Sequence, residues 1–468
     1  MAIAEKINEL IWKSSAKIRE IIGDRICDIF LVFMIIGLYA IESVIPLGLV
    51  SRSGYYMFAL IFLAIWLVYE KKTELKTLKD IGVFAVFLLG LVFFVSAIVF
   101  SDRSRAMEGI CFMFLMPFGI FVLSGKENFE RFMKVFGIAS VIGFVLLMLV
   151  SWVVAPIFYF RYSSLLLNPN GLSKILIPMF VGTLITIARS VNEYKKIPLY
   201  CLLGIEAFYM IATRSRTGLL SIFGILVIWV CYALSRKAVD KKKKSKGIAL
   251  IGVVAMVVCV AVTPSIHSSV SRLYVQSQLN AKGEATFLDV TRKNITEKIT
   301  ITDISYLTDK QATNAITVIA GTTTRLEKYA VEDVDISAGR FTIWKSAVKA
   351  LNLKGHSSTE EFPVPGRQKI KTTNDPHNAF LSIGFKTGYV GLIAVLFVAV
   401  IVAIRCIVII AGAIKKKELS YKEAITLSFG YSYLLIGMLA GSYLPISEVV
   451  AAMFWLTIPV SQRKEKEV

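Results

Sequence analysis

Two arginines stand in a short turn between two apolar runs, in the stretch IATRSRTGLLSIFG. Arg214 and Arg216 occupy the turn, and Thr217 and Gly218 open the second run, which is predicted to be a helix. A helix N-terminus offers free N–H groups and partial positive charge, and a guanidinium can donate two parallel hydrogen bonds to phosphate oxygens. The stretch therefore predicts a binding site for an anion.

A histidine stands where a polar, lysine-rich stretch meets a long apolar run, in TTNDPHNAFLSIGFKTGYVGL. We expect Asp375 to cap a helix and Pro376 to take its first position, which places His377 in the first turn. The positive end of the helix dipole favours the neutral ring, which is able to accept a proton. Asn378 is expected to orient a substrate. The alternative is an ordinary surface histidine.

Two further stretches place polar groups beside apolar runs. LLLNPNGLSK predicts a turn and cap over 168–171, with Asn170 in the turn and Lys174 one turn inside the next span. A lysine at that depth either pairs, with Glu206 in the following span as the candidate, or contacts a ligand. DISAGRFTIWKSAVKAL predicts a helix that starts at Arg340.

The helix predicted from Arg340 onward is amphipathic, because Phe341, Trp344, Val348 and Leu351 share one face. Such a helix either lies on a membrane surface or packs these side chains in an ordinary core.

The elements that must position these residues are apolar runs. Hydrophobic residues make up 56% of the 468-residue chain and its mean hydropathy is +0.66, as in polytopic helical membrane proteins and unlike soluble ones. The apolar runs, separated by charged breaks, predict an all-α membrane protein with about twelve transmembrane helices. The predicted helices lie near 28–50, 54–69, 81–100, 106–123, 132–159, 171–188, 197–212, 217–234, 248–263, 388–412, 423–440 and 447–461.

Basic residues assign the two sides of the membrane. Thirty of the 53 Lys and Arg residues fall in alternate segments that include both termini, so both termini are predicted to be cytoplasmic. The opposite short loops carry only arginines, namely Arg52, Arg103, Arg105, Arg161, Arg214 and Arg216. Because the guanidinium fork suits phosphate, we expect an anionic ligand outside, with Arg103 as a supporting residue. The alternative is that these arginines reach for lipid headgroups.

One long loop, 264–376, lies on the same outer side. It separates N-terminal membrane helices (1–263) from C-terminal membrane helices (377–468), and its middle, around 290–330, alternates polar and β-branched residues as strands do. None of the six cysteines falls in this loop, so disulfides and a cysteine metal site are not expected. The net charge of +20 lies mostly beside the spans, which favours contact with membrane lipid over nucleic acid.

Four motifs occur in a fixed order over roughly residues 160–440: NPNGLS, TRSRTGLL, GRFTIWKSAV and PHNAFLSIGFKTGYVGL. With the spans and the single long outer loop, they resemble the O-antigen ligase and polysaccharide polymerase family of membrane glycosyltransferases. The resemblance implies a GT-C-like fold, an undecaprenyl-pyrophosphate-linked glycan as donor, and action on the outer face of the bacterial cytoplasmic membrane. It implies no nucleotide, metal or other cofactor, and a role in cell-envelope and exopolysaccharide biosynthesis.

By position, Arg214 or Arg216 and Arg340 match the family's pyrophosphate-binding arginines, and His377 matches its proposed base. One departure concerns the stretch LNLKGHSSTEEFPVPG, which is longer and more polar than the tight Pro- and Gly-containing loop usual in the family. The acceptor is therefore not implied by the resemblance.

These observations predict an inverting, metal-independent glycosyltransferase in which His377 is the general base. The acceptor is another lipid-linked repeat unit in a polymerase, or a different acceptor glycan such as lipid A core in a ligase. The excess of lysine over arginine is typical of low-GC genomes. It favours the polymerase, because an organism of that kind without lipid A has no lipid A core to serve as a ligase acceptor. The alternative is a transporter or lipid-linked saccharide flippase, which predicts broken helices and mid-membrane charges; apart from Lys174 and Glu206, the sequence suggests few such charges.

Overall fold

The computed structural model describes residues 2–44, 53–74, 80–154, 162–166, 168–239, 243–282, 284–289, 295–300, 340–365, 371–441 and 443–457. Most of these residues are helical. In chain order the helices are α1 (Ala2–Ile22), α2 (Asp24–Val44), α3 (Ser53–Val68), α4 (Ile81–Phe100), α5 (Arg103–Ile110), η3 (Cys111–Leu115), α6 (Met116–Leu123), α7 (Lys126–Val154), η4 (Ser164–Leu166), α8 (Pro169–Arg189), η5 (Glu193–Lys195), α9 (Lys196–Thr213), α10 (Arg216–Val239), α11 (Lys243–Lys282), α15 (Arg340–Ala350), α16 (Ala379–Lys416), α17 (Tyr421–Ala440) and α18 (Val449–Thr457).

Nine helical segments in the described part of the chain are long and apolar enough to cross a membrane. They are Asp24–Ser43, Ile81–Phe100, Arg103–Leu123, Lys126–Val153, Pro169–Arg189, Lys196–Thr213, Arg216–Ser235, Ala379–Lys416 and Tyr421–Ala440. The other three predicted spans coincide with shorter helical segments: α3, the Ile251–His267 part of α11, and α18, which is described to Thr457. The prediction of an all-α membrane protein is confirmed, whereas the count of twelve full-length spans is not.

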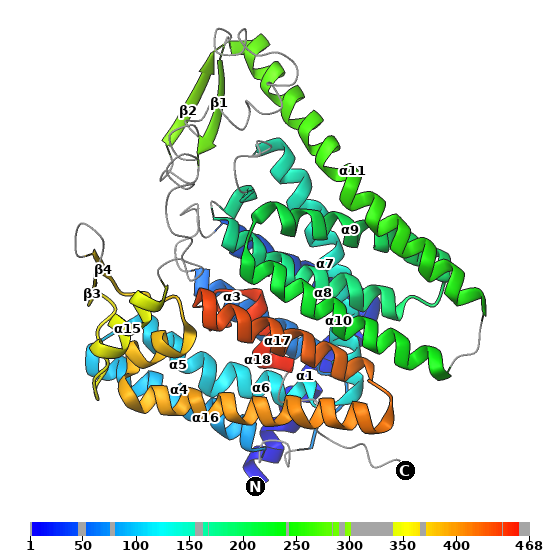
Figure 1. Ribbon diagram of the computed structural model, residues 1–468. Coiled ribbons are helices and arrows are strands. Elements are labelled where there is room, and N and C mark those ends of the chain that lie inside the picture. Colours follow the sequence, from blue (N-terminus) through cyan, green and yellow to red (C-terminus); the bar gives the residue numbers. More distant parts are fainter. Residues whose placement is uncertain are drawn as a thin grey trace.

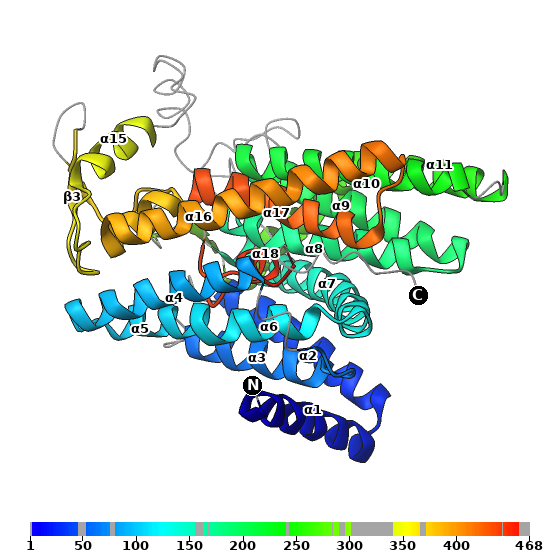
Figure 2. The same ribbon diagram turned by 90° about the horizontal axis from the view of Figure 1, so that it is seen from below.

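The long helices lie side by side, and α15, β3 (Phe362–Val364) and β4 (Lys371–Thr373) gather at one end of them, at the left of Figure 1 and Figure 2. The N-terminus of α16 lies at this end, which we call the loop end. Ala347 of α15, Phe362 of β3 and Phe385 of α16 form a small buried cluster. This cluster fixes α15 over the start of α16.

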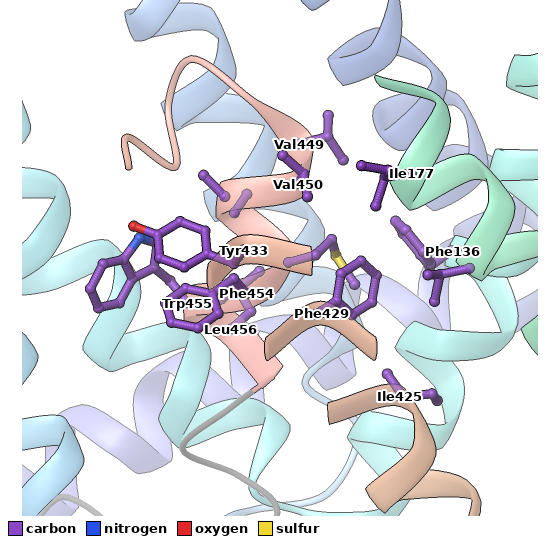
Figure 3. Packing of buried hydrophobic residues seen from close by; sticks show 14 of the residues in the cluster. Phe136, Ile177, Ile425, Phe429, Tyr433, Val449, Val450, Phe454, Trp455 and Leu456 are labelled. Carbon is purple, nitrogen blue, oxygen red and sulfur yellow. The ribbon is translucent and has the colours of Figure 1, made fainter. Parts of the chain in front are cut away.

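The centre of the bundle is built around α18, whose nine residues are all buried. Phe454 stacks on Tyr433 of α17 with ring centroids 3.7 Å apart, and Trp455 packs edge-on against both rings (Figure 3). The indole Nε1 of Trp455 also donates to the Tyr443 carbonyl at 2.9 Å. These contacts fix Tyr443, which precedes α18, against the α18 helix.

Helix α16 is interrupted at Gly388, which has φ 76° and ψ −172°. The backbone there lies against Leu353 and Gly355, so closely that a Cβ at position 388 would overlap the Leu353 carbonyl. Tyr389 N–H donates to the Asn352 carbonyl at 3.0 Å. The break therefore receives the loop that follows α15, and glycine is required because other residues rarely adopt this backbone conformation.

The region predicted as a long outer loop begins with helix. Because α11 continues to Lys282, the predicted boundary at 263/264 falls inside it. β1 (Glu284–Asp289) and β2 (Ile295–Thr300) then form an antiparallel pair with Glu284 opposite Thr300. The strand-like pattern is confirmed for β2, and residues 301–339 of that prediction lie outside the described residues.

Candidate active site

His377 lies at the loop end and forms a pair with Asp375. The backbone N–H of His377 donates to Asp375 Oδ1 at 2.8 Å, and ring Nδ1 lies 3.0 Å from Oδ2. About half of the histidine side chain, 50%, is exposed. A carboxylate beside Nδ1 makes that nitrogen the donor, which leaves Nε2 as the proton acceptor.

The carboxyl of Asp375 is held in its charged form. Burial raises its pKa, but the hydrogen bonds and charge of His377 lower it further than burial raises it, and the charge of Lys174 adds to the lowering. The net result is a pKa below the ordinary aspartate value. Asp375 is therefore a carboxylate at neutral pH and can stabilise positive charge on the His377 ring.

The predicted start of the helix after His377 was wrong. The helix cap is Asn378, whose side-chain oxygen accepts from Leu381 N–H at 3.1 Å. His377 precedes the helix in a left-handed conformation with φ 52°, and this backbone cannot continue into a helical turn. Asn378 is itself buried and donates from Nδ2 to the Met438 carbonyl at 3.1 Å, so it fixes the two helices that flank His377.

Lys174 approaches the same place from α8. Its ammonium lies 2.7 Å from Glu448 Oε1 and 3.5 Å from the Ala440 carbonyl at the end of α17. The predicted pairing with Glu206 is wrong, because Glu206 accepts from Thr183 at 2.8 Å. Thr183 lies nine residues further along α8, a separation of about 14 Å.

The loop between α17 and α18 joins these groups. Gly441 lies against His377, with a Cβ at that glycine falling 3.3 Å from His377 Cα and 3.4 Å from Asp375 Oδ1. Glu448 ends the loop, and Glu42 of α2 accepts from the next residue's N–H, Val449, at 2.9 Å. A lysine and two carboxylates therefore stand directly behind the Asp375–His377 pair.

The arginine turn is attached to α8 one residue before Lys174. Ser173 Oγ donates to Ser215 Oγ at 3.1 Å, and Ser215 Oγ accepts from Gly218 N–H at 3.3 Å, which makes Ser215 the cap of α10. The helix starts at Arg216, one residue earlier than predicted, and Arg214 holds the turn with φ 49°. Both arginine side chains are exposed.

Arg340 lies within electrostatic range of Arg216. Burial lowers the pKa of Arg340, and the charge of Arg216 lowers it further. The helix that carries Arg340 does start there, but Phe341 and Val348 of its predicted apolar face are 69% and 52% exposed. The two guanidiniums therefore repel each other, and an anion bound between them would offset the repulsion.

The remaining predicted residues lie apart or have other roles. Arg103 is exposed at the start of α5, and among the described contacts none joins it to His377 or Arg340. Asn170 stands in the first turn of α8, where its N–H donates to the cap Asn168 at 2.9 Å, as the turn prediction requires. Arg52 and Arg161 lie outside the described residues.

The other two histidines have structural partners. His356 stacks on Phe385 with centroids 4.2 Å apart and lies 2.6 Å from Glu360. His267 is buried in α11, 3.0 Å from the Tyr209 hydroxyl. Among the described residues, no group of three or more His, Cys, Asp or Glu side chains is arranged to hold a metal ion.

Sequence reasoning missed the roles of Asp375 and Glu448. The signal for Asp375 is its spacing, since an aspartate two residues before His377 can bond both to the backbone and to the ring. The signal for Glu448 is a carboxylate at the start of an apolar helix, which needs a cation when buried.

The family model described as O-antigen ligase matches residues 199–396. This range includes Arg214, Arg216, Arg340 and His377. No curated protein and no solved structure was found to match the chain, and the GT-C-like arrangement stays a prediction.

The match and the nine candidate spans support a multi-pass membrane protein related to enzymes that process polysaccharide. The matched region, residues 199–396, agrees with the family that the motifs indicated.

Proposed function

We propose that this protein moves a glycan from undecaprenyl pyrophosphate to an acceptor hydroxyl, with His377 as the general base. The observation that carries the proposal is the exposed His377 ring, held through Nδ1 by the charged Asp375 at 3.0 Å. Such a ring presents Nε2 to an acceptor. A positioned base of this kind contributes roughly 10²- to 10⁴-fold to a rate.

The proposed reaction is a single displacement. The acceptor hydroxyl gives its proton to His377 Nε2 while its oxygen bonds to the anomeric carbon of the donor sugar. The bond from that carbon to the pyrophosphate oxygen breaks, and the electron pair leaves with the lipid pyrophosphate. Attack opposite to the leaving group inverts the anomeric configuration, and Asp375 stabilises the imidazolium that forms.

The leaving group is assigned to the arginines. Arg216 and Arg340 approach from α10 and α15, and Arg214 stands in the same turn as Arg216. Guanidinium groups bind phosphate oxygens in pairs and neutralise the charge that develops on the departing pyrophosphate. This is the positive charge that a divalent metal supplies in other enzymes, so the proposed reaction is independent of metal.

The site is assigned to the extracytoplasmic face. The proposal is supported by the basic residues, which concentrate in the alternate segments that include both termini, as expected if the termini are inside and the loop end is outside. Lipid-linked glycans of this class are used on that side. Labelling of a single cysteine introduced at Thr372 with an impermeant reagent in intact cells tests this assignment.

Either of two acceptors fits this chemistry. A polymerase adds the glycan to another lipid-linked repeat unit, and a ligase adds it to a different acceptor glycan. Cells that lack the protein distinguish them, because loss of a polymerase leaves lipid-linked single repeats and loss of a ligase leaves lipid-linked long chains. Accumulation of neither species argues against both.

A transporter or flippase is the second candidate, and the structure has features that bear on it in both directions. Buried charges are more frequent than the sequence suggested, since Glu42, Arg105 and Glu108 are all buried, and α16 is broken at Gly388. However, Arg105 donates to the Lys386 carbonyl at 2.8 Å, which satisfies the group that the break leaves free. A break whose free carbonyl is bonded by a buried arginine is typical of structural packing between helices and not of a translocation path.

Transfer by purified protein tests the proposed function. Detergent-solubilised protein is mixed with an undecaprenyl-pyrophosphate-linked glycan and an acceptor, and the product is resolved by mass spectrometry. Glycosyl transfer by the wild type supports the enzyme. A flippase would move the donor across a vesicle and leave its glycosidic bond intact.

A further inference from the structure

Helix α17 ends against the proposed base. Its last residue is Ala440, and Gly441 follows in a left-handed conformation and lies against His377. The last carbonyls of a helix have no partner inside it and carry partial negative charge. At the end of α17 the ammonium of Lys174 lies 3.5 Å from the Ala440 carbonyl, so a cation stands where the helix end meets His377.

Charged groups approach His377 from several elements. Asp375, on the same segment, lies 3.0 Å from ring Nδ1. Lys174 comes from α8, and Glu448, 2.7 Å from its ammonium, comes from the loop before α18. Glu42 of α2 accepts from the first N–H of α18, next to Glu448. These four residues are the charged groups that the described contacts link to the ring on this side.

These groups act on the ring with opposite signs. The carboxylate of Asp375 and the end of α17 favour a protonated ring, whereas the start of α16 and the ammonium of Lys174 favour a neutral one. The charge of Lys174 reaches Asp375, whose pKa it helps to lower. The side chains of Lys174 and Glu448 are each 18% exposed, so solvent screens their charges weakly. The balance at His377 therefore depends on this pair.

Stability alone does not account for the pair. Desolvation of two charges offsets much of their attraction, so a buried ion pair is weak evidence for a stabilising role. Glu448 Oε2 is also buried and has no hydrogen-bond partner among the described residues. The position of Lys174 at the end of α17 gives the pair a second effect, which is exerted on His377.

We propose that the Lys174–Glu448 pair sets the proton affinity of His377, and with it the pH range in which this ring is a base. The inference rests on the proposed function, because it concerns the same base. Lys174 is a positioning residue, since it acts on the ring through Asp375 and the end of α17. Its positive charge keeps the ring neutral before transfer, and Glu448 limits that effect so that the ring still takes the acceptor's proton.

Two variants remove one charge each. Lys174→Met keeps a long side chain without its charge, so the ring should hold its proton to a higher pH. Glu448→Gln removes the negative charge, so the ring should lose its proton at a lower pH. Both variants break the same ion pair, and a purely structural role would change the titration of His377 in one direction or not at all. Shifts of opposite sign are therefore specific to the proposal.

The titration of His377 is measured by nuclear magnetic resonance and does not require activity. The chain has three histidines, so protein isotope-labelled at histidine Cε1 gives three resonances, and His377→Gln identifies the one that belongs to His377. Relative to the wild type, the titration midpoint should rise by roughly half a unit to one unit in Lys174→Met and fall by a similar amount in Glu448→Gln.

Lys386 provides the matched control on the first part of α16. It is also paired with a glutamate, 3.3 Å from Glu108, and its side chain is 30% exposed. About 10 Å of helix separates it from Ala379. Lys386→Met therefore breaks a comparable pair further from the ring, and the midpoint of His377 should move less than half as far as in Lys174→Met.

Kinetics separates this inference from the proposed function. If the wild type transfers glycan, the acidic limb of kcat/KM against pH should move in the same directions as the midpoints. If the wild type transfers none, the proposed function fails, and the titration of His377 alone decides the inference.

Three results overturn the proposal: midpoints that move in the same direction in Lys174→Met and Glu448→Gln, midpoints that do not move, and a midpoint that moves as far in Lys386→Met as in Lys174→Met. If Lys174→Met does not fold, Glu448→Gln decides, because a midpoint that does not fall in that variant overturns the proposal and one that falls supports it.

Discussion

Arg105, on one hand, and Arg216 and Arg340, on the other, have different surroundings in this molecule. Arg105 is 1% exposed, and its guanidinium donates to the Lys386 carbonyl at 2.8 Å and to the His356 carbonyl at 2.7 Å. Arg216 is exposed, and Arg340 is half-buried close enough to feel its charge. Arg105 holds the loop after α15 against the break in α16, whereas Arg216 and Arg340 bring α10 and α15 within range of each other's charge.

The comparison teaches that residue type and membrane side do not assign a role to an arginine. All the arginines of the short loops predicted to be outside meet the same charge rule. What distinguishes them is their surroundings. The guanidinium of Arg105 is buried against backbone carbonyls, whereas Arg340 lies close enough to Arg216 for the two charges to repel each other.

The largest expected effect comes from the base. His377→Ala should lower the rate of glycan transfer by roughly 10²- to 10⁴-fold, because no other group replaces the proton acceptor. The protein should still fold, since the side chain is half exposed. Thr372→Ala, an exposed neighbour, is the control. Transfer rates of purified proteins measure the effect, and a His377→Ala rate near that of the control would remove His377 from the mechanism.

The two sets of arginines should respond differently to lysine. Arg216→Lys and Arg340→Lys should each lower transfer roughly tenfold or more, because charge remains but the bidentate contact with phosphate is lost. Arg105→Lys should instead lower the melting temperature, since buried carbonyls lose their donors at about 1–3 kcal/mol each. Activity per folded molecule and thermal melting measure the two effects. The comparison fails if all three variants lose only activity or only stability.

Asp375→Asn should have a smaller effect on rate. We expect kcat to fall about tenfold with KM unchanged, because the ring loses the carboxylate that orients it and stabilises its charge. The pKa of Asp375 is lower than its ordinary value, so its carboxylate is charged above that value and is protonated only as the pH falls through the folded-state pKa. The carboxylate is therefore present at neutral pH, where kcat of the two proteins is compared. A variant kcat equal to that of the wild type at neutral pH would contradict the assigned partner.

Chelation should have the smallest effect. If the guanidiniums of α10 and α15 supply the positive charge at the pyrophosphate, excess EDTA leaves transfer within about twofold of the untreated rate. Purified protein and donor in metal-free buffer provide the measurement. Loss with EDTA and recovery with Mg²⁺ or Mn²⁺ would reassign the leaving-group chemistry, and Asp375 would be the first residue to examine as a ligand.

Much of the framework could be predicted from the sequence, because apolar runs have to be helices in a membrane. The cap at Asn168 and the helix starting at Arg340 follow from local rules and are present. The start of α16 does not, since both Asp375 and Asn378 are suitable caps. Asn378 caps it, and its amide also reaches Met438, 60 residues away in the chain. The choice therefore depends on tertiary contacts.

The partners of buried charges were also beyond the sequence. Lys174 pairs with Glu448, 274 residues away, because the two stand at the same depth in the bundle, and depth is not visible along the chain. Likewise the sequence does not distinguish Arg105 from the other arginines of the predicted outer loops, whereas in the structure its guanidinium donates to the His356 carbonyl. Spacing predicted which residues could bind a phosphate and could not separate binding residues from structural ones.

The central claim is a single displacement at the Asp375–His377 pair with lipid pyrophosphate as the leaving group. Nuclear magnetic resonance of the product from purified wild-type protein, made with a donor of known anomeric configuration, tests it most directly. The account predicts transfer with the opposite configuration at the new glycosidic bond and release of undecaprenyl pyrophosphate. Transfer with retained configuration, or a donor that stays intact beside a competent acceptor, would contradict it.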